Sequence, residues 1–254
     1  MDKGNRPLEN RVALVTGSGR GLGRACALAL ADAGAAVVVN STRTETCQAT
    51  ADEIKANGGL SYAIVADVSD ELQVQTMVEA ALAWQGRLDI LINNAGFTVV
   101  HPIDEISLDE WNRVLAVNLT GMFLCCKASV PIMRRQRWGR IINMSSIAGL
   151  RGALFGDVHY ATTKAGQIGF SKTLARTVAR DGITVNCVAP GPIATDLMEA
   201  NITGERMRLA LAEIPRGRFG SQEELAGTVV FLCTDTAAHI TGATINVNGG
   251  AYMQ

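Results

Sequence analysis

The sequence predicts an α/β fold in which a doubly wound, mostly seven-stranded parallel sheet carries helices on both faces. Three observations support this prediction. Apolar runs of strand length alternate with longer helical patterns, several of these runs are almost continuously apolar, and a glycine-rich turn follows the first run. Strands buried on both faces give continuous apolar runs, and strands that alternate with helices form parallel sheets.

The predicted elements follow one another along the chain. Strands are expected at 12–15, 36–39, 62–65, 90–92, 140–144, 184–188 and 244–247, where short apolar runs lie. Helical patterns fill the gaps at 25–31, 70–84, 118–135, 160–180 and 223–233. Right-handed crossovers bring the loops after the strands to the carboxyl edge of the sheet, where we expect a ligand to bind.

Composition indicates one domain. The chain has 254 residues, of which 48% are hydrophobic and 19% charged, and no linker divides it, so we expect a single domain over 11–254. Residues 1–10 are polar and lack an apolar signal core, which favours a flexible tail and a cytoplasmic protein. The net charge of −1 gives no general attraction to nucleic acid or to an anionic membrane.

The cysteines and histidines do not suggest a metal site. No pair of cysteines has the C-x-x-C spacing, so we expect reduced, mostly buried thiols without disulfide or zinc roles. The three histidines are far apart in sequence and need no metal to explain them. The residues concerned are Cys26, Cys47, Cys125, Cys126, Cys187, Cys233, His101, His159 and His239.

A glycine-rich turn, TGSGRGLG at 16–23, lies between the first strand and the first helix. Glycines let the backbone approach a diphosphate closely, and the N-terminus of the following helix presents free N–H groups to the anion. An ordinary glycine turn is the alternative. The residues predicted to bind a cofactor that contains such a diphosphate are Gly17, Ser18, Gly19, Arg20, Gly21, Leu22 and Gly23.

Tyr160 and Lys164 are four residues apart, a spacing that places both side chains on one face of a helix. A cation within about 4 to 6 Å of a phenol stabilises the phenolate and lowers the phenol pKa from about 10 toward neutrality. Such a phenol can give a proton to a carbonyl or take one from an alcohol. The alternative is a surface tyrosine beside an unrelated lysine.

The order T-G-x-x-x-G-x-G followed by Y-x-x-x-K resembles the classical short-chain dehydrogenase/reductase family over about residues 8–251. The resemblance implies a Rossmann-type fold and hydride transfer between a nicotinamide and a carbonyl or secondary alcohol. It also implies that Tyr160 is the acid, that Lys164 lowers its pKa and holds the ribose, and that Asn118 holds a water beside that lysine. Ser146 would hydrogen-bond the substrate oxygen.

One departure from the family pattern bears on which serine would hydrogen-bond the substrate oxygen. Ser146 precedes Tyr160 by fourteen residues, one more than in many relatives, and Ser145 is adjacent. Gly149 aligns with the glycine that usually follows the active serine, which favours Ser146. We place the extra residue within 150–158 and interpret Ser145 as a strand-end hydroxyl bonded to the backbone.

The resemblance assigns the remaining cofactor contacts. The adenine side would be bound by one pair after the third strand and by an N-N-A-G motif, and a further segment would close over the nicotinamide. Residues 195–215 resemble a substrate lid, with a pair of plain surface helices as the alternative. The residues assigned are Asp67, Val68, Asn94, Ala95, Gly96, Pro190, Gly191, Ile193 and Thr195.

The end of the second strand favours NADP over NAD. An NAD enzyme usually places an acid here to bind the ribose 2′-hydroxyl, whereas this chain has Ser41 followed by Thr42 and Arg43. With Arg20 nearby, a 2′-phosphate would meet no repulsion. The alternative is that both arginines face solvent.

Substrate and partners are less well defined. The C-terminal half is most similar to the 3-oxoacyl-[acyl-carrier-protein] reductases, and basic residues 134–137 with Arg140 could form a rim for an acidic carrier. Asp181 stands where those reductases commonly have a base, and a solvated helix end is the alternative for the arginines. A small ketone, sugar or polyol is the alternative substrate, and a non-catalytic dinucleotide-binding protein the alternative class. The resemblance also implies a homotetramer.

Overall fold

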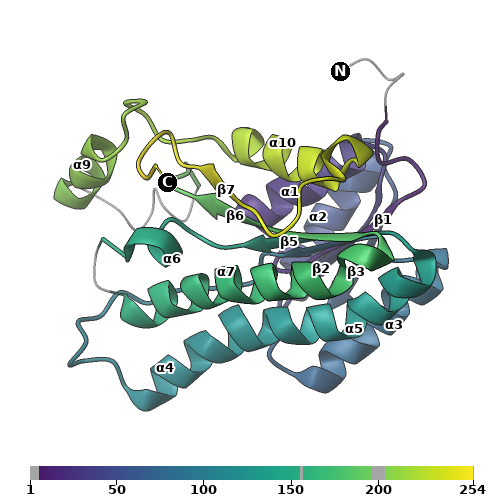
Figure 1. Ribbon diagram of the computed structural model, residues 1–254, viewed down its shortest axis with the longest axis horizontal. Helices are drawn as coiled ribbons and strands as arrows, with labels where there is room; N and C mark the ends of the chain where they lie inside the picture. The colour runs from purple at the N-terminus through teal and green to yellow at the C-terminus, as the bar shows by residue number, and fades with distance from the viewer. Residues whose placement is uncertain (1–5, 155–156, 196–203, 254) are drawn as a thin grey trace.

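The computed structural model describes residues 6–154, 157–195 and 204–253. Its centre is one parallel sheet in the strand order β3-β2-β1-β4-β5-β6-β7 (Figure 1). The strands are β1 (Val12–Val15), β2 (Ala36–Ser41), β3 (Ser61–Val65), β4 (Ile90–Asn93), β5 (Gly139–Met144), β6 (Ile183–Pro190) and β7 (Thr244–Val247). Every predicted strand is present and the doubly wound fold is confirmed.

Helices cover both faces of the sheet (Figure 1). One layer contains α1 (Gly21–Asp32), α2 (Thr44–Ala56) and α10 (Gln222–Cys233), and the other contains α3 (Glu71–Gln85), α4 (Leu108–Leu115), α5 (Gly121–Gln136) and α7 (Val158–Val178). Two short helices, α6 (Ala148–Arg151) and α9 (Glu205–Ala212), lie at the left end of the molecule in Figure 1. Short 3-10 turns, η2 (Ala179–Asp181) and η3 (Asp235–Ala237), follow α7 and α10.

The helix predicted at 118–135 begins ten residues earlier, at Leu108. The Ser107 hydroxyl caps it by accepting the backbone N–H of Glu110 at 3.1 Å, and the acidic first turn favours the helix dipole. A π-helical segment, η1 (Ala116–Thr120), joins α4 to α5. By length and hydropathy alone the continuous helix 108–136 could cross a membrane, but half of its most apolar window is buried inside the protein.

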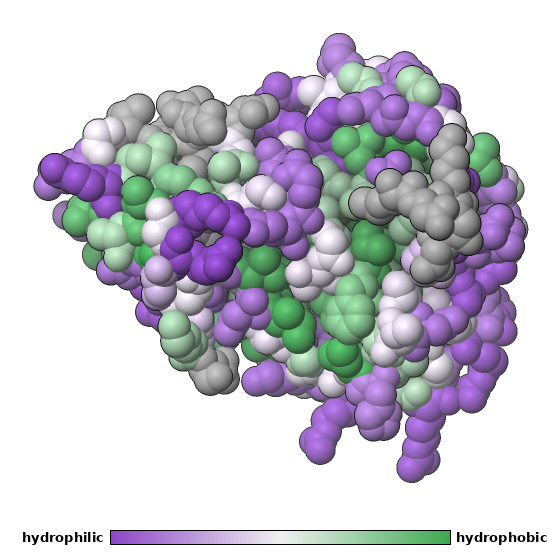
Figure 2. All heavy atoms as spheres, turned by 90° about the horizontal axis from the view of Figure 1, so that it is seen from above, coloured by the Kyte–Doolittle hydropathy of each residue, from purple (hydrophilic) through white to green (hydrophobic). Residues whose placement is uncertain are grey.

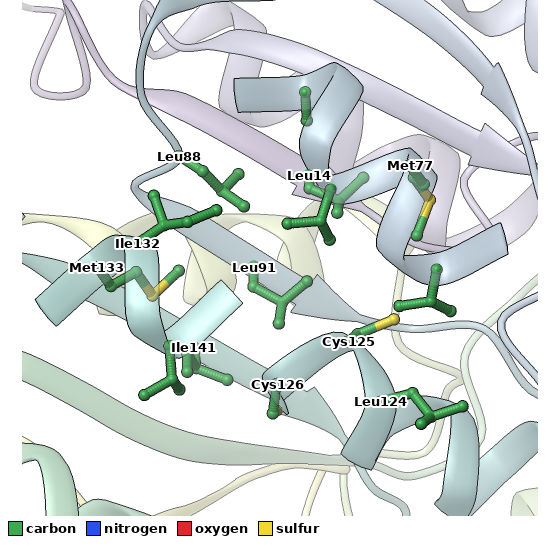
Figure 3. Packing of buried hydrophobic residues seen from close by; sticks show 14 of the residues in the cluster. Leu14, Met77, Leu88, Leu91, Leu124, Cys125, Cys126, Ile132, Met133 and Ile141 are labelled. Atoms are coloured by element: carbon green, nitrogen blue, oxygen red, sulfur yellow. The ribbon is translucent and has the colours of Figure 1, made fainter. Parts of the chain in front are cut away.

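The hydrophobic core has two parts, one on each face of the sheet. Figure 3 shows the part beneath α3 and α5, where Leu14 and Leu91 of the sheet lie among side chains such as Met77. On the opposite face Val37 packs in a cluster that includes Leu30 of α1. Because the central strands are covered on both faces, alternation of apolar and polar residues would bury polar groups, which explains their continuous apolar runs.

All six cysteines are free thiols and all are buried, as the sequence predicts. Burial raises the pKa of Cys26 and of Cys125 to about 12. A thiol with so high a pKa stays protonated and unreactive near neutral pH. These residues therefore act as small apolar side chains of the core.

The chain already packs onto the sheet before residue 11. Leu8 is 1% exposed, and its backbone N–H donates to the carbonyl of Ala33 at 2.9 Å. Burying a leucine side chain contributes about 2 kcal/mol, which offsets part of the entropy lost when this segment is ordered. The ordered region thus includes Leu8, within the segment that the polar composition assigns to a tail, while residues 1–5 lie outside the described residues.

Candidate active site

The site forms where the strand order reverses. From β1 the sheet continues to β2 on one side and to β4 on the other, so the loops after β1 and β4 leave in opposite directions. In doubly wound sheets this divergence opens a crevice at the carboxyl ends of the strands, and ligands bind there. The loops that follow β5 and β6 begin at this same carboxyl edge of the sheet.

The turn after β1 has the shape that a diphosphate requires. Gly17 and Gly21 have φ values of +62° and +56°, which favour glycine. A Cβ at Gly17 would lie 2.8 Å from the Cα of Ala95, and one at Gly23 would lie 2.4 Å from the carbonyl oxygen of Gly17. A Cβ at Gly21 would meet nothing within 4 Å, so the turn is open on that side.

The start of α1 suits an anion for the same reason. Its N-cap residue, Arg20, makes no side-chain cap, whereas Asp70, Ser107 and Ser221 cap α3, α4 and α10 with their side chains. The first N–H groups of a helix need an acceptor, and a phosphate supplies one. The predicted turn residues therefore fit the diphosphate of a nicotinamide dinucleotide.

Neighbouring polar side chains hold this turn in place. The Thr16 hydroxyl accepts the backbone N–H groups of Asn94 and Ala95, each at 3.1 Å, and the Asn94 amide donates to the Gly17 carbonyl at 3.0 Å. The buried Asn40 accepts the Gly17 N–H at 3.3 Å. Asn40 thus supports the glycine turn from the end of β2.

Ser18 is also a support rather than a free cofactor ligand. It is fully buried, its hydroxyl donates to the carbonyl of Val15 at 2.7 Å, and its N–H donates to the carbonyl of Asn40 at 2.7 Å. A sequence cannot show which hydroxyls of a turn face inward, and here the Ser18 hydroxyl is turned into the protein.

The end of β2 brings two hydroxyl groups together beside the turn. Ser41 and Thr46 hydroxyls are 3.2 Å apart, and the N–H of Arg43 donates to Ser41 at 3.2 Å. A Cβ at Gly19 would lie 2.6 Å from the Thr46 hydroxyl, so this pair contacts the glycine turn directly. The sequence pattern at the end of β2 did not point to Thr46, because this residue belongs to the following helix, α2. Arg20 and Arg43 are exposed.

On the adenine side, the Asp67 carboxylate accepts the N–H and the hydroxyl of Ser69 at 2.9 and 2.7 Å. Val68 is buried and packs against Gly121, where a Cβ would lie 2.7 Å from a Val68 methyl group. Both residues are thereby held just after the carboxyl end of β3, and their contact with an adenine stays a prediction.

The two serines after β5 have different partners. Ser145 is buried, and its hydroxyl donates to the backbone carbonyl of Lys164 at 2.9 Å. Ser146 is partly exposed, and its hydroxyl accepts the backbone N–H of Ala148 at 3.1 Å. Its side chain is also close enough to the Tyr160 phenol to act on the pKa of that group. The structure thus places Ser146 beside Tyr160 and gives Ser145 the backbone role that the sequence suggested.

The Tyr160 pKa is raised, opposite to the direction predicted from its neighbour Lys164. Burial is the main cause; the nearby Ser146 side chain acts against it, and the charge of Asp157 adds to it. The ammonium group lies 5.4 Å from the centre of the phenol ring and donates to the carbonyl of Met144 at 2.6 Å instead. Tyr160 therefore remains protonated at neutral pH, as a proton donor must.

Lys164 is almost completely buried beneath the site, at 4% exposure. Burial lowers its pKa to about 8, and the nearby Cys187 only partly opposes this. Gly149 of α6 packs so closely that a Cβ there would lie 2.5 Å from the backbone carbon of Lys164. The extra residue before Tyr160 thus leaves the contact between α6 and α7 intact.

Asn118 lies in the π-helical segment η1 and is fully buried. Its side chain holds the loop after β4: the amide oxygen accepts the N–H of Phe97 at 3.0 Å, and the amide nitrogen donates to the Phe97 carbonyl at 2.9 Å. Its backbone carbonyl accepts the side-chain amide of Gln167 at 2.6 Å. π-helical segments often occur at functional sites because they redirect backbone groups.

A histidine pair that the sequence left without a role lies beside Tyr160. Nδ1 of His159 accepts the Tyr160 N–H at 2.8 Å, so its proton is on Nε2, which donates to Glu110 at 3.0 Å. Nδ1 of His101 is 3.0 Å from the other oxygen of Glu110. The hydrogen bond from His159, then that from His101, lowers the pKa of Glu110.

The segment after β6 is partly described. Pro190 ends the strand, the Gly191 N–H donates to the Val247 carbonyl at 3.0 Å, and Ile193 is buried and bridges to Gly220. Of the expected lid at 195–215, residues 196–203 lie outside the described residues. The remainder contains α9, whose following residue Glu213 is paired with Arg151 of α6.

The predicted basic rim does not lie at the site within this chain. Arg134 and Arg137 both pair with Asp181, at 2.9 and 3.2 Å, at the end of α5. Arg140 is 2% exposed and pairs with Asp235. These residues lie near the amino end of β5, whereas Ser146 follows its carboxyl end, so the charges serve the helix end and the sheet.

A serine beside a protonated tyrosine, next to a turn shaped for a diphosphate, meets the needs of an oxidoreductase that uses a dinucleotide. A family model described as enoyl-(acyl carrier protein) reductase matches residues 17–252. The chain belongs to the short-chain dehydrogenase/reductase family, and it is an oxidoreductase that acts with a nicotinamide cofactor on carbonyl or CH–OH groups.

Curated relatives match over nearly the full length. The chain is 47% identical to a 3-oxoacyl-[acyl-carrier-protein] reductase of Synechocystis, over 97% of this chain and 98% of the relative. Reductases of the same name from Staphylococcus aureus and Escherichia coli are 46% and 44% identical, over 96% and 97% of this chain and 98% and 99% of the relatives. A solved structure titled "Crystal structure of gox2181" has a TM-score of 0.94 at 33% identity, over 97% of both chains.

Proposed function

We propose that this protein is an NADPH-dependent reductase of 3-oxoacyl groups attached to an acyl carrier protein. The neighbouring side chains of Ser146 and Tyr160 carry the proposal, because they bring two hydroxyl groups to the place where a carbonyl oxygen would receive a proton. Reduction of a carbon–carbon double bond, which the name of the family model suggests, offers no such oxygen at the reacting carbon. The names of the relatives support the choice of substrate.

In this reaction the residues of the site have different tasks. Tyr160 donates its proton to the substrate oxygen, and Ser146 hydrogen-bonds the same oxygen. The bound cofactor supplies the hydride. Lys164 holds the ribose hydroxyls and places its positive charge beside the phenol as the proton leaves, while Asn118 fixes the loop at Phe97.

The proposed preference for NADPH rests on the end of β2. Ser41 and Thr42 are neutral, and Arg20 and Arg43 are exposed beside the glycine turn, so a 2′-phosphate would meet hydrogen-bond donors and no carboxylate. We expect Ser41→Asp to reverse the preference, because a carboxylate there repels the phosphate and binds a ribose hydroxyl. The measurement is kcat/KM with NADPH and NADH for both proteins. Better use of NADH by the unmodified protein would contradict the proposal.

One observation favours a small polar substrate as the second candidate. Asp157 is buried one turn before Tyr160, and its carboxylate accepts the hydroxyl of Thr98 at 2.8 Å. A carboxylate at this edge of the site can bind a hydroxyl group of a sugar or polyol. A carrier-linked substrate would place its acyl chain there instead, and an acyl chain makes no hydrogen bond to the Asp157 carboxylate.

The two candidates are separated by a comparison of substrates. NADPH consumption is measured by absorbance with a 3-oxoacyl group on carrier protein, with a small 3-oxoester, and with a panel of keto sugars. The proposal predicts a higher kcat/KM for the carrier-linked substrate than for the ester. Turnover of the keto sugars without turnover of the carrier-linked substrate would assign the enzyme to the second candidate.

We further propose a cytoplasmic homotetramer in which residues 11–254 form the catalytic unit. Large hydrophobic side chains are exposed on two different faces: Phe123 of α5, in edge contact with Phe170, and Phe231 of α10. Figure 2, which looks onto the side of α10, shows hydrophobic residues gathered near the centre of this face and bordered by hydrophilic ones. Two separate faces suit the two interfaces of a tetramer with dihedral symmetry. Light scattering at micromolar protein should give about four times the 26.9 kDa chain mass.

A further inference from the structure

Gln167 lies one helical turn after Lys164 on α7 and is 1% exposed. Residues three and four apart share a face of a helix, so Tyr160, Lys164 and Gln167 form one row facing the end of β5. A buried glutamine has a donor end and an acceptor end, and both need partners. The site described above does not account for such a residue.

Both ends of the Gln167 side chain contact predicted catalytic residues. The amide nitrogen donates to the backbone carbonyl of Asn118 at 2.6 Å, and the amide oxygen accepts the ammonium group of Lys164 at 3.4 Å. The reverse orientation would set the amide nitrogen against the ammonium and the amide oxygen against the carbonyl. The surrounding groups therefore determine which way the amide points.

This arrangement also fixes the ammonium group. Lys164 has three N–H donors, of which one is directed at Met144 and one at Gln167 within the described part of the chain. The third remains for the ribose or for the phenol. An ammonium group on a flexible four-carbon stem would otherwise sample several directions.

We propose that Gln167 is a positioning residue that joins Asn118 to Lys164 and aims the ammonium group at the reaction site. The inference rests on the proposed carbonyl reduction, in which Lys164 acts beside Tyr160. The amide oxygen stabilises the charged form of the lysine, and the amide nitrogen satisfies a buried carbonyl in the π-helical segment. Gln167 touches neither substrate nor cofactor in this role.

The test compares the pH dependence of kcat/KM in the unmodified enzyme, Gln167→Leu and Gln167→Glu. Because burial lowers the pKa of Lys164 to about 8, the unmodified enzyme should lose activity as the pH rises through about 8. The leucine removes the acceptor, so this decline should move to lower pH by about one unit, with a loss of kcat of about tenfold. The glutamate gives a charged acceptor, so the decline should move to higher pH.

Opposite shifts distinguish positioning from a merely structural role. Other titratable groups near Lys164 are Tyr160 on α7 and Cys187 on β6, with Asp157 beside Tyr160. Burial raises the pKa of Cys187, so its thiol stays neutral through this range. If both variants lose activity while the decline stays at the same pH, the inference is overturned.

Gln136→Leu is a matched control. The Gln136 side chain also bridges two polar groups, accepting the Leu88 N–H at 3.0 Å and donating to the Leu88 carbonyl at 2.8 Å, but near the amino end of β4. Gln136→Leu should lower the free energy of unfolding without changing the pH at which kcat/KM declines. A shift here would show that the pH profile responds to destabilisation alone, and would overturn the inference.

A direct titration separates this inference from the proposed function. If the unmodified protein reduces no ketone, the proposed function fails, but the ε-carbon signal of Lys164 can still be titrated by NMR in ¹³C-lysine protein. Its loss in Lys164→Met assigns it among the five lysines. The lysine should deprotonate at lower pH in Gln167→Leu and at higher pH in Gln167→Glu, and an unchanged titration in both would overturn the inference.

Discussion

Tyr160→Phe is expected to lower turnover at least about a hundredfold and to leave cofactor affinity nearly unchanged. The substitution removes the hydroxyl that would give the proton, while the buried ring is retained. Turnover is measured as NADPH oxidation with a 3-oxoacyl substrate, and affinity by quenching of protein fluorescence. The loss should appear mainly in kcat, because the proton is transferred only in the transition state.

Tyr62→Phe provides the control for this variant. Tyr62 lies on the edge strand β3, is 40% exposed and packs against Trp84, far from the reaction. It should retain full activity. Near-normal turnover in Tyr160→Phe, or an equal loss in both variants, would remove Tyr160 from the role of acid.

Lys164→Met is expected to weaken both turnover and cofactor affinity, because one ammonium group serves the ribose and the phenol. Methionine keeps most of the apolar stem, so the packing beneath Ser145 is preserved. The dissociation constant of NADPH and kcat are measured together at pH 7. An unchanged dissociation constant would show that Lys164 does not hold the ribose.

The same variant changes how stability depends on pH. Burial lowers the pKa of Lys164 from 10.5 to about 8, so between these pH values the unfolded state binds more protons than the folded state. The free energy of unfolding of the unmodified protein should therefore rise with pH across this window, by about 3 kcal/mol relative to Lys164→Met. Urea unfolding of both proteins at pH 7.5 and pH 10.5 measures the difference.

Lys172→Met controls for the loss of a positive charge from the same helix. Lys172 is exposed on α7, so its removal should not change the pH dependence of stability. The lowered pKa of Lys164 would be contradicted if the free energies of unfolding of the unmodified protein and of Lys164→Met differed by the same amount at pH 7.5 and at pH 10.5.

The sequence determined the fold and most of the site because both depend on local patterns. A strand covered on both faces must be apolar throughout, which is why 12–15 and 36–39 could be recognised from composition alone. The glycines of the turn are required by local backbone geometry at Gly17 and Gly21. The spacing of Tyr160 and Lys164 follows from the period of a helix. Each of these features is set by residues that are neighbours in the chain.

The tertiary structure alone decided which polar groups are used and which are free. Ser18 and Asn40 bond inside the protein, Arg134 and Arg137 neutralise Asp181, and Gln167 reaches Asn118 across 49 residues of chain. The direction of the Tyr160 pKa was likewise decided by burial and not by the neighbouring lysine. Hydrogen bonds and desolvation depend on which segments meet in space, and a sequence does not record those distances.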